Sequence, residues 1–76
     1  MEEKQKEKQN VLRQLGERIR KLRKEKGMSQ EKFADESGVE RSYMGAIERG
    51  ERNPTFIKLY MIAKALKVSL PHLFEF

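Results

Sequence analysis

The chain has 76 residues, which is room for one small domain. It has no cysteine and one histidine, so disulfides and thiolate metal ligands are excluded, and we expect neither a metal nor a cofactor. Seventeen lysines and arginines against 12 acidic residues indicate a polyanionic partner. No stretch approaches the length of apolar sequence that spans a membrane, and no secretion signal opens the chain, so we expect a soluble cytoplasmic protein.

The positive charge is concentrated in one segment. Residues 1–12 and residues 27–76 each carry equal numbers of basic and acidic side chains, so the whole net charge of +5 lies in residues 13–26. This segment has seven basic residues and only two acidic ones, Glu17 and Glu25. We interpret the run RIRKLRKEK mainly as the solvated side of a helix that adds weak attraction for phosphates.

The N-terminal part divides into a polar and a periodic section. The first nine residues, MEEKQKEKQ, have no apolar residue after the initial Met, so we predict a flexible extension over residues 1–9. Asn10 then offers an N-cap, and apolar residues recur at helical spacing from Leu12 to Leu22. The pattern ends at Gly27 and predicts a first helix over about residues 11–26.

Two short helices follow, separated by a glycine. Ser29 caps the segment QEKFADES, which ends at Gly38 after about two turns. The next segment, ERSYMGAIERG, directs Met44 and Ile47 to one side and small and polar residues to the other, and Gly50 closes it. Two short helices joined in this way are typical of a helix-turn-helix.

The last part of the chain predicts two more helices. After the polar loop ERNP, Thr55 caps a helix over about residues 56–67, and Ser69 caps the short helix LPHLF. The longer helix has a core stripe of Phe56, Leu59, Ile62, Ala63 and Leu66. Its remaining apolar residues and the C-terminal end exceed what one core requires, and we assign them to dimerisation: Ile57, Tyr60, Met61, Leu73, Phe74 and Phe76. No segment alternates with period two, so residues 10–76 are predicted to form one all-α, five-helix domain.

The outward face of the third helix is unusual for a solvated surface. Gly45 in a helix interior costs about 1 kcal/mol relative to alanine, and close approach to a DNA major groove, with Ala46 beside it, offsets that cost. Arg41 and Ser42 stand at the N-terminal end of the helix, where an arginine fork matches the two acceptors of guanine. Arg49 points the same way, so we include it in the DNA-binding face.

The run GMSQEKFADESGVERSYMGAIERGERNPTFIKLYMIAKALKVS resembles the helix-turn-helix family of phage repressors and Cro proteins. It is most similar to the controller proteins of restriction-modification systems, in which an Arg, a Ser or Thr and a Tyr begin the recognition helix and Glu-Arg-Gly closes it. The resemblance covers about residues 11–74. It implies a phosphate contact by Gln30, base reading by Arg41 and Ser42, and backbone contacts by Tyr43, Arg52 and Asn53.

Glu40 departs from the family pattern, which usually has Ser, Thr or Asp at this position. Glutamate is a weaker N-cap and repels phosphate, so we expect Glu40 to orient Arg41 or to select against some bases.

One charged pair has a structural role in our interpretation. Arg23 follows Ile19 by four residues and Glu48 follows Met44 by four, so both lie at the edge of an inward face. We predict that they meet as a buried ion pair, which the family resemblance supports, and we exclude both from the binding surface.

These observations predict a sequence-specific, duplex-DNA-binding transcriptional regulator that acts as a homodimer on a near-palindromic operator, of the restriction-modification controller type. RNA polymerase is a candidate further partner, and the expected location is the nucleoid. No nucleophile stands with an orienting base, so we do not expect an enzyme.

Two alternatives stay open. In the first, the same fold serves a phage or plasmid repressor, an antitoxin or a host regulator. In the second, the chain is a protein-interaction module without DNA selectivity, which Glu40 favours and which the basic excess, Gly45 and Arg41 oppose.

Overall fold

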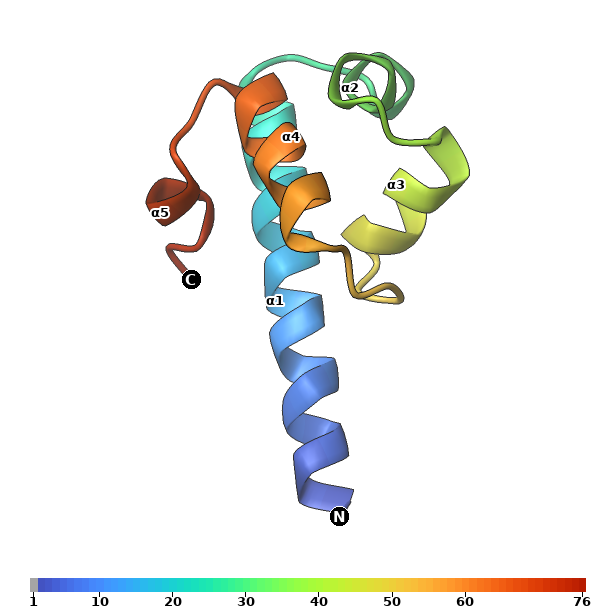
Figure 1. Cartoon of the computed structure of the whole chain (residues 1–76), viewed down its shortest axis with the longest axis vertical. Coiled ribbons are helices and arrows are strands. Elements are labelled where there is room, and N and C mark those ends of the chain that lie inside the picture. The colour runs from blue at the N-terminus through green and yellow to red at the C-terminus, as the bar shows by residue number, and fades with distance from the viewer. Residues whose placement is uncertain (1) are drawn as a thin grey trace.

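The computed structural model describes residues 2–76, and its regular elements are five helices (Figure 1). In chain order they are α1 (Glu2–Glu25), α2 (Gln30–Ser37), α3 (Arg41–Glu48), α4 (Phe56–Leu66) and α5 (Leu70–Leu73). No strand occurs within residues 2–76. The predicted five-helix, all-α fold is confirmed.

The first helix is longer than the sequence pattern predicted. It begins at Glu2 rather than near Val11, so the predicted start of this helix is wrong, and Met1 lies outside the described residues. Lysine, glutamate and glutamine are good helix formers, two glutamates in the first turn favour the helix dipole, and elongation from the packed part needs no new nucleus. Asn10 is not an N-cap: its Oδ1 accepts a hydrogen bond from Nη2 of Arg13 at 3.0 Å.

Three of the other helices, α2, α4 and α5, begin where short polar side chains predicted them. The hydroxyls of Ser29, Thr55 and Ser69 each accept a hydrogen bond from the backbone N–H three residues later, at 3.1, 3.2 and 3.2 Å. These caps depend only on neighbouring residues, which is why the sequence located them.

The turn between α2 and α3 depends on one glycine. Gly38 adopts a left-handed φ of 70°, and its N–H bonds the carbonyl groups of the last turn of α2. The next N–H, that of Val39, donates to the carbonyl of Ala34 at 3.0 Å, and the Val39 side chain packs in the core. The turn therefore holds α3 at a fixed angle to α2.

The five helices enclose one core, drawn from every helix and from the α2–α3 turn. In Figure 1, α1 runs the length of the molecule, with α2 and α3 on one side of it and α5 on the other, and α4 packs against α2 and α5. The fully buried large side chains are Ile19, Leu22, Phe33, Met44, Ile47, Ile62, Leu66 and Leu73. The first half of α1 contributes nothing to this core, because every side chain from Glu2 to Val11 is exposed.

A glycine in α1 sets the distance between α1 and α3. A Cβ atom on Gly16 would lie 2.4 Å from the carbonyl oxygen of Ile47 and 2.6 Å from that of Glu48. Only a residue without a side chain lets the two backbones come this close.

Two apolar residues have exchanged their predicted places. Leu73, assigned to dimerisation, is fully buried, because Arg18 of α1 donates from Nη2 to the carbonyl of His72 at 2.8 Å where α5 returns to the domain. Phe56, assigned to the core stripe, is 63% exposed, because it stands at the first position of α4, where the helix projects beyond the core.

Candidate nucleic-acid interface

The third helix presents a narrow outer ridge. Met44 and Ile47 of α3 are buried in the core, while Arg41, Ser42 and Arg49 are exposed on the opposite side. No acidic residue lies in the first turn of α3, so its N-terminal end is open to an acceptor group.

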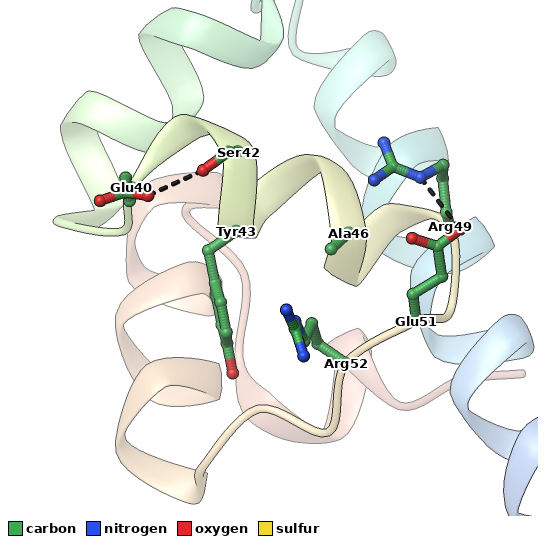
Figure 2. A pocket seen from close by; sticks show the side chains of 7 residues that line it. All are labelled: Glu40, Ser42, Tyr43, Ala46, Arg49, Glu51 and Arg52. Carbon is green, nitrogen blue, oxygen red and sulfur yellow. Dashed lines mark hydrogen bonds and ion pairs between the residues drawn. The ribbon is translucent and has the colours of Figure 1, made fainter.

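The surface is hollowed on both sides of this ridge. We call the hollow on the side of α4 the α4 flank; it is lined by Glu40, Ser42, Tyr43, Ala46, Arg49, Glu51 and Arg52 (Figure 2). We call the hollow on the side of α1 the α1 flank; it is lined by Arg20, Arg23, Gln30, Gly45, Glu48 and Arg49. Arg49 lines both hollows, so the two flanks meet at this side chain.

An aromatic ring and an arginine line the α4 flank, and a lysine of α4 lies over the same ring. Figure 2 shows the side chains of Tyr43 and Arg52 directed toward one another across the hollow. The Arg52 guanidinium carbon lies 5.9 Å from the centroid of the Tyr43 ring, and Nζ of Lys58 lies 4.3 Å from the same centroid. The ring orients two positive charges beside α3.

The Glu40 side chain contacts a different residue from the one we expected. Its Oε1 accepts a hydrogen bond from Oγ of Ser42 at 2.7 Å, and it makes no cap hydrogen bond to α3. The expectation that Glu40 orients Arg41 is therefore wrong in this structure, because the hydroxyl two residues further on takes up the carboxylate. Arg41 extends from the start of α3 without that restraint.

The floor of the α1 flank is a closed network of charges. Arg23 donates from Nε to Oε2 of Glu48 at 2.7 Å and from Nη2 to Oε1 at 3.0 Å, and its Nη1 donates to the carbonyl of Met28 at 2.9 Å. Gln30 completes it by donating from Nε2 to Oε1 of Glu48 at 3.1 Å. The pair expected from the spacing is bidentate and almost fully buried, with side-chain exposures of 10% for Arg23 and 3% for Glu48.

The small residues of α3 are covered rather than bare. Gly45 and Ala46 are both buried. A Cβ on Gly45 would lie 3.2 Å from Nη1 of Arg49 and 3.3 Å from Oε1 of Gln30. Gly45 thus lies at the floor of the α1 flank and Ala46 at the floor of the α4 flank.

The loop after α3 separates two residues that the sequence grouped together. Arg52 lines the α4 flank, whereas the exposed Asn53 lines a different hollow with residues of the first half of α1, among them Gln5, Lys8 and Leu12. The structure therefore does not bring Asn53 into either hollow beside α3.

The apolar surface assigned to dimerisation lies away from α3 on the exposed side of α4. Exposed fractions on α4 are 65% for Ile57, 49% for Tyr60 and 37% for Met61. Phe74 and Phe76, at 41% and 53%, extend the apolar surface into the C-terminal segment, and the exposed Phe56 joins it as well. With Leu73 removed and Phe56 added, we call these six residues the apolar patch.

Sequence reasoning missed three residues near α3. A helix-interior glycine was interpreted at Gly45 but not at Gly16, although the same energetic argument applies to both. Lys58 stands beside Tyr43 through the folding of α4 against α3, and Arg20 reaches the α1 flank through the packing of α1, so neither placement has a local signal in the sequence.

Within residues 2–76 no group of three His, Asp or Glu side chains is placed to hold a metal ion. In the same residues no helix has both the length and the apolar composition that a membrane crossing requires.

Comparison with known proteins places these features in a family. The HTH_3 family of helix-turn-helix proteins matches residues 19–73. The control protein C.SmaI of Serratia marcescens is 46% identical over 59 residues, which cover 78% of this chain and 70% of that protein. The restriction-modification controller protein C.AhdI from Aeromonas hydrophila is 42% identical, with a TM-score of 0.80 over 86% of this chain and 97% of that one.

A further solved structure is that of a complex with DNA. It contains the restriction-modification controller protein C.Esp1396I as a tetramer with its natural 35 base-pair operator. That protein is 43% identical to this chain, with a TM-score of 0.79 over 86% of each chain. These proteins are regulators and controllers rather than enzymes. The resemblance seen in the sequence is confirmed, and the chain belongs to the HTH_3 helix-turn-helix family, among relatives that include restriction-modification controller proteins.

Proposed function

We propose that the chain is a sequence-specific transcriptional regulator that binds duplex DNA as a homodimer, with α3 in the major groove. The observation that carries the proposal is the shape of α3: an exposed ridge with a hollow on each flank, and arginine side chains in both hollows. A helix in a major groove is bordered by a phosphate strand on each side, and this surface has the matching form, with arginine side chains available on both sides.

We assign base reading to the ridge. Arg41 and Ser42 stand at the N-terminal end of α3, where recognition helices contact base edges. Arg49 follows the other end of α3 and lines both flanks, so we assign it to the backbone. The Ser42 hydroxyl donates to Glu40, so its oxygen remains an acceptor for a base amino group. Glu40 then acts on specificity through Ser42 rather than through Arg41.

We assign backbone contacts to the flanks. Tyr43 and Arg52 stand together in the α4 flank, and Gln30 stands at the N-terminus of α2 beside the α1 flank. Asn53 follows Arg52 directly in the loop, and we assign it a contact with the DNA backbone outside the α4 flank. These contacts set the register of the duplex and supply affinity that falls with salt.

We assign the apolar patch to a second copy of the chain. One recognition helix contacts too few base pairs to select a site, and six large apolar side chains on α4 and in the C-terminal segment are exposed. The operator is then near-palindromic, with half-sites about 34–36 Å apart. Such a regulator acts at the nucleoid in the cytoplasm, in a restriction-modification system, with RNA polymerase as a further partner.

The test is selection from a random pool of duplex DNA at about 0.15 M salt, with wild type, Arg41→Ala and Lys21→Ala run in parallel. We expect wild type and Lys21→Ala to enrich the same two-fold symmetric site. Arg41→Ala should lose about 1–3 kcal/mol on that site and should lose its preference at one symmetric position.

Enrichment of an asymmetric site would count against the homodimer. If none of the proteins enriched any sequence, the proposed function would be wrong, and a protein-interaction module would be the remaining candidate.

A further inference from the structure

The α1 flank is more positive than the roles assigned so far require. Its floor is neutral overall, because Glu48 is held on one side by both donors of Arg23 and on the other by Gln30. Two further guanidinium groups, those of Arg20 and Arg49, line the hollow above this floor. The hollow as a whole therefore carries excess positive charge.

Arg20 is the uncommitted member of this group. It is exposed on α1, and within residues 2–76 no carboxylate lies within 4.0 Å of it and no side-chain hydrogen bond engages it. Other arginines are engaged: Arg18 with α5, Arg23 with Glu48, and Arg49 with Glu51 at 3.2 Å. An exposed arginine free of internal partners keeps all five of its donors for a ligand.

The position of Arg20 is fixed by the packing of α1 against α3. Gly16, one turn before Arg20, brings the α1 backbone against the carbonyl oxygens of Ile47 and Glu48. This contact places the next turn of α1 beside Gly45, on the same side of α3 as the N-terminus of α2. Arg20 therefore reaches the flank of the recognition helix from a different helix.

Each flank combines a small residue of α3 with an arginine from another segment of the chain. The α4 flank combines the small Ala46 with Arg52, and the α1 flank combines the side-chain-free Gly45 with Arg20. The phosphate strands that border a major groove lie on opposite sides of the inserted helix, and the α4 flank accounts for one of them.

We propose that Arg20 is a DNA-backbone contact: with Gln30 and Arg49 it seats one phosphate of the strand that lies on the α1 flank. This inference rests on the proposed function and deepens it by adding α1 to the DNA-binding surface. It gives a role to part of the positive segment, residues 13–26, that the sequence treated as a solvated face.

The chain offers a matched control. Lys21 follows Arg20 directly on α1, is exposed, carries the same charge and lines neither flank of α3. Arg20→Ala and Lys21→Ala therefore remove equal charge from the same helix, and only the first removes it from the α1 flank. Arg20→Lys keeps the charge at the site without the planar fork.

The experiment measures the affinity of wild type and these three variants for the duplex that wild type selects from a random pool, over a series of salt concentrations. Arg20→Ala should bind about fivefold or more weakly at 0.15 M salt. The slope of log affinity against log salt should fall by about 0.9 for each protomer, or about 1.8 for a dimer. Lys21→Ala should lose less than about twofold, and Arg20→Lys should retain most of the slope. Melting temperatures should be equal in all four proteins, because neither side chain has an internal partner.

A second measurement locates the contact. Replacing single phosphates of the selected duplex by neutral methylphosphonates should reveal one position per half-site that weakens wild type but leaves Arg20→Ala unaffected.

Equal affinities and equal salt slopes for Arg20→Ala and Lys21→Ala would overturn the role of Arg20 while leaving the proposed function intact. Failure of wild type itself to bind any duplex would overturn both, so the two failures are distinguishable.

Discussion

Two groups of polar residues surround α3, and they use similar side chains in opposite ways. The inner group of Arg23, Gln30 and Glu48 is largely buried, and each member bonds another. The outer group of Arg20, Arg41 and Arg52 is exposed, and no carboxylate pairs with any of the three within residues 2–76.

The difference teaches where each guanidinium acts. A buried charge without a partner is strongly unfavourable, so each member of the inner group depends on the others. Because Arg23, Gln30 and Glu48 come from α1, α2 and α3, their bonds hold these three helices together. An exposed arginine without an internal partner contributes little to stability, and its donors remain for an external acceptor. Changes in the Arg23–Glu48 pair should therefore alter stability, and changes in the outer group should alter binding, while the part-buried Gln30 belongs to both.

The strongest test of this comparison is Glu48→Ala. It leaves the buried Arg23 guanidinium without its counterion and removes the acceptor of Gln30, so we expect the free energy of unfolding to fall by about 3–5 kcal/mol. A small domain has only about 5–15 kcal/mol in total, so the variant should lose a large share of its stability. Urea unfolding at fixed protein concentration measures this.

A double variant separates charge from packing. Arg23→Met combined with Glu48→Leu removes both charges and keeps the volume, so it should recover most of the stability that Glu48→Ala loses. An unchanged melting temperature in Glu48→Ala would show that the inner group is not structural, and the comparison would then fail.

The second test concerns the close approach of α1 to α3. Glycine to alanine in a helix interior ordinarily stabilises by about 1 kcal/mol. Here the added Cβ would lie 2.4 Å from a backbone oxygen of α3, so we expect Gly16→Ala to destabilise by about 1–3 kcal/mol instead. Thermal unfolding measures the effect, and Gln14→Ala on the exposed side of α1 should change stability by less than about 0.5 kcal/mol. A Gly16→Ala protein more stable than wild type would show that the two backbones separate at little cost.

The sequence predicted the parts of the fold that depend on neighbouring residues. Hydroxyl caps at Ser29, Thr55 and Ser69 and the left-handed turn at Gly38 are local, so the starts of α2, α4 and α5 and the helix-turn-helix unit were found. The start of α1 was missed, because an exposed helix of charged residues has no apolar periodicity to reveal it.

The parts that the sequence could not predict depend on contacts between distant segments. Leu73 is in the core, and Phe56 outside it, because of where α5 and α4 dock, which periodicity within a helix does not report. At the candidate interface, Arg41, Ser42 and Tyr43 follow from their place on α3, whereas Arg20 and Lys58 come from other helices. Those two placements required the three-dimensional structure.

The smallest expected effect belongs to the outer group and sharpens its definition. Arg52 lies over the Tyr43 ring, and contacts of this kind at exposed sites contribute only about 0.5–1 kcal/mol, so Arg52→Ala should barely change the melting temperature. It should instead weaken binding to matched and scrambled duplexes alike and lower the salt slope by about one for each protomer. Titration of both duplexes over a salt series measures this, with Lys21→Ala as the control for charge. If Arg52→Ala lost affinity only for the matched duplex, Arg52 would contact bases rather than the backbone, and the α4 flank would read sequence directly.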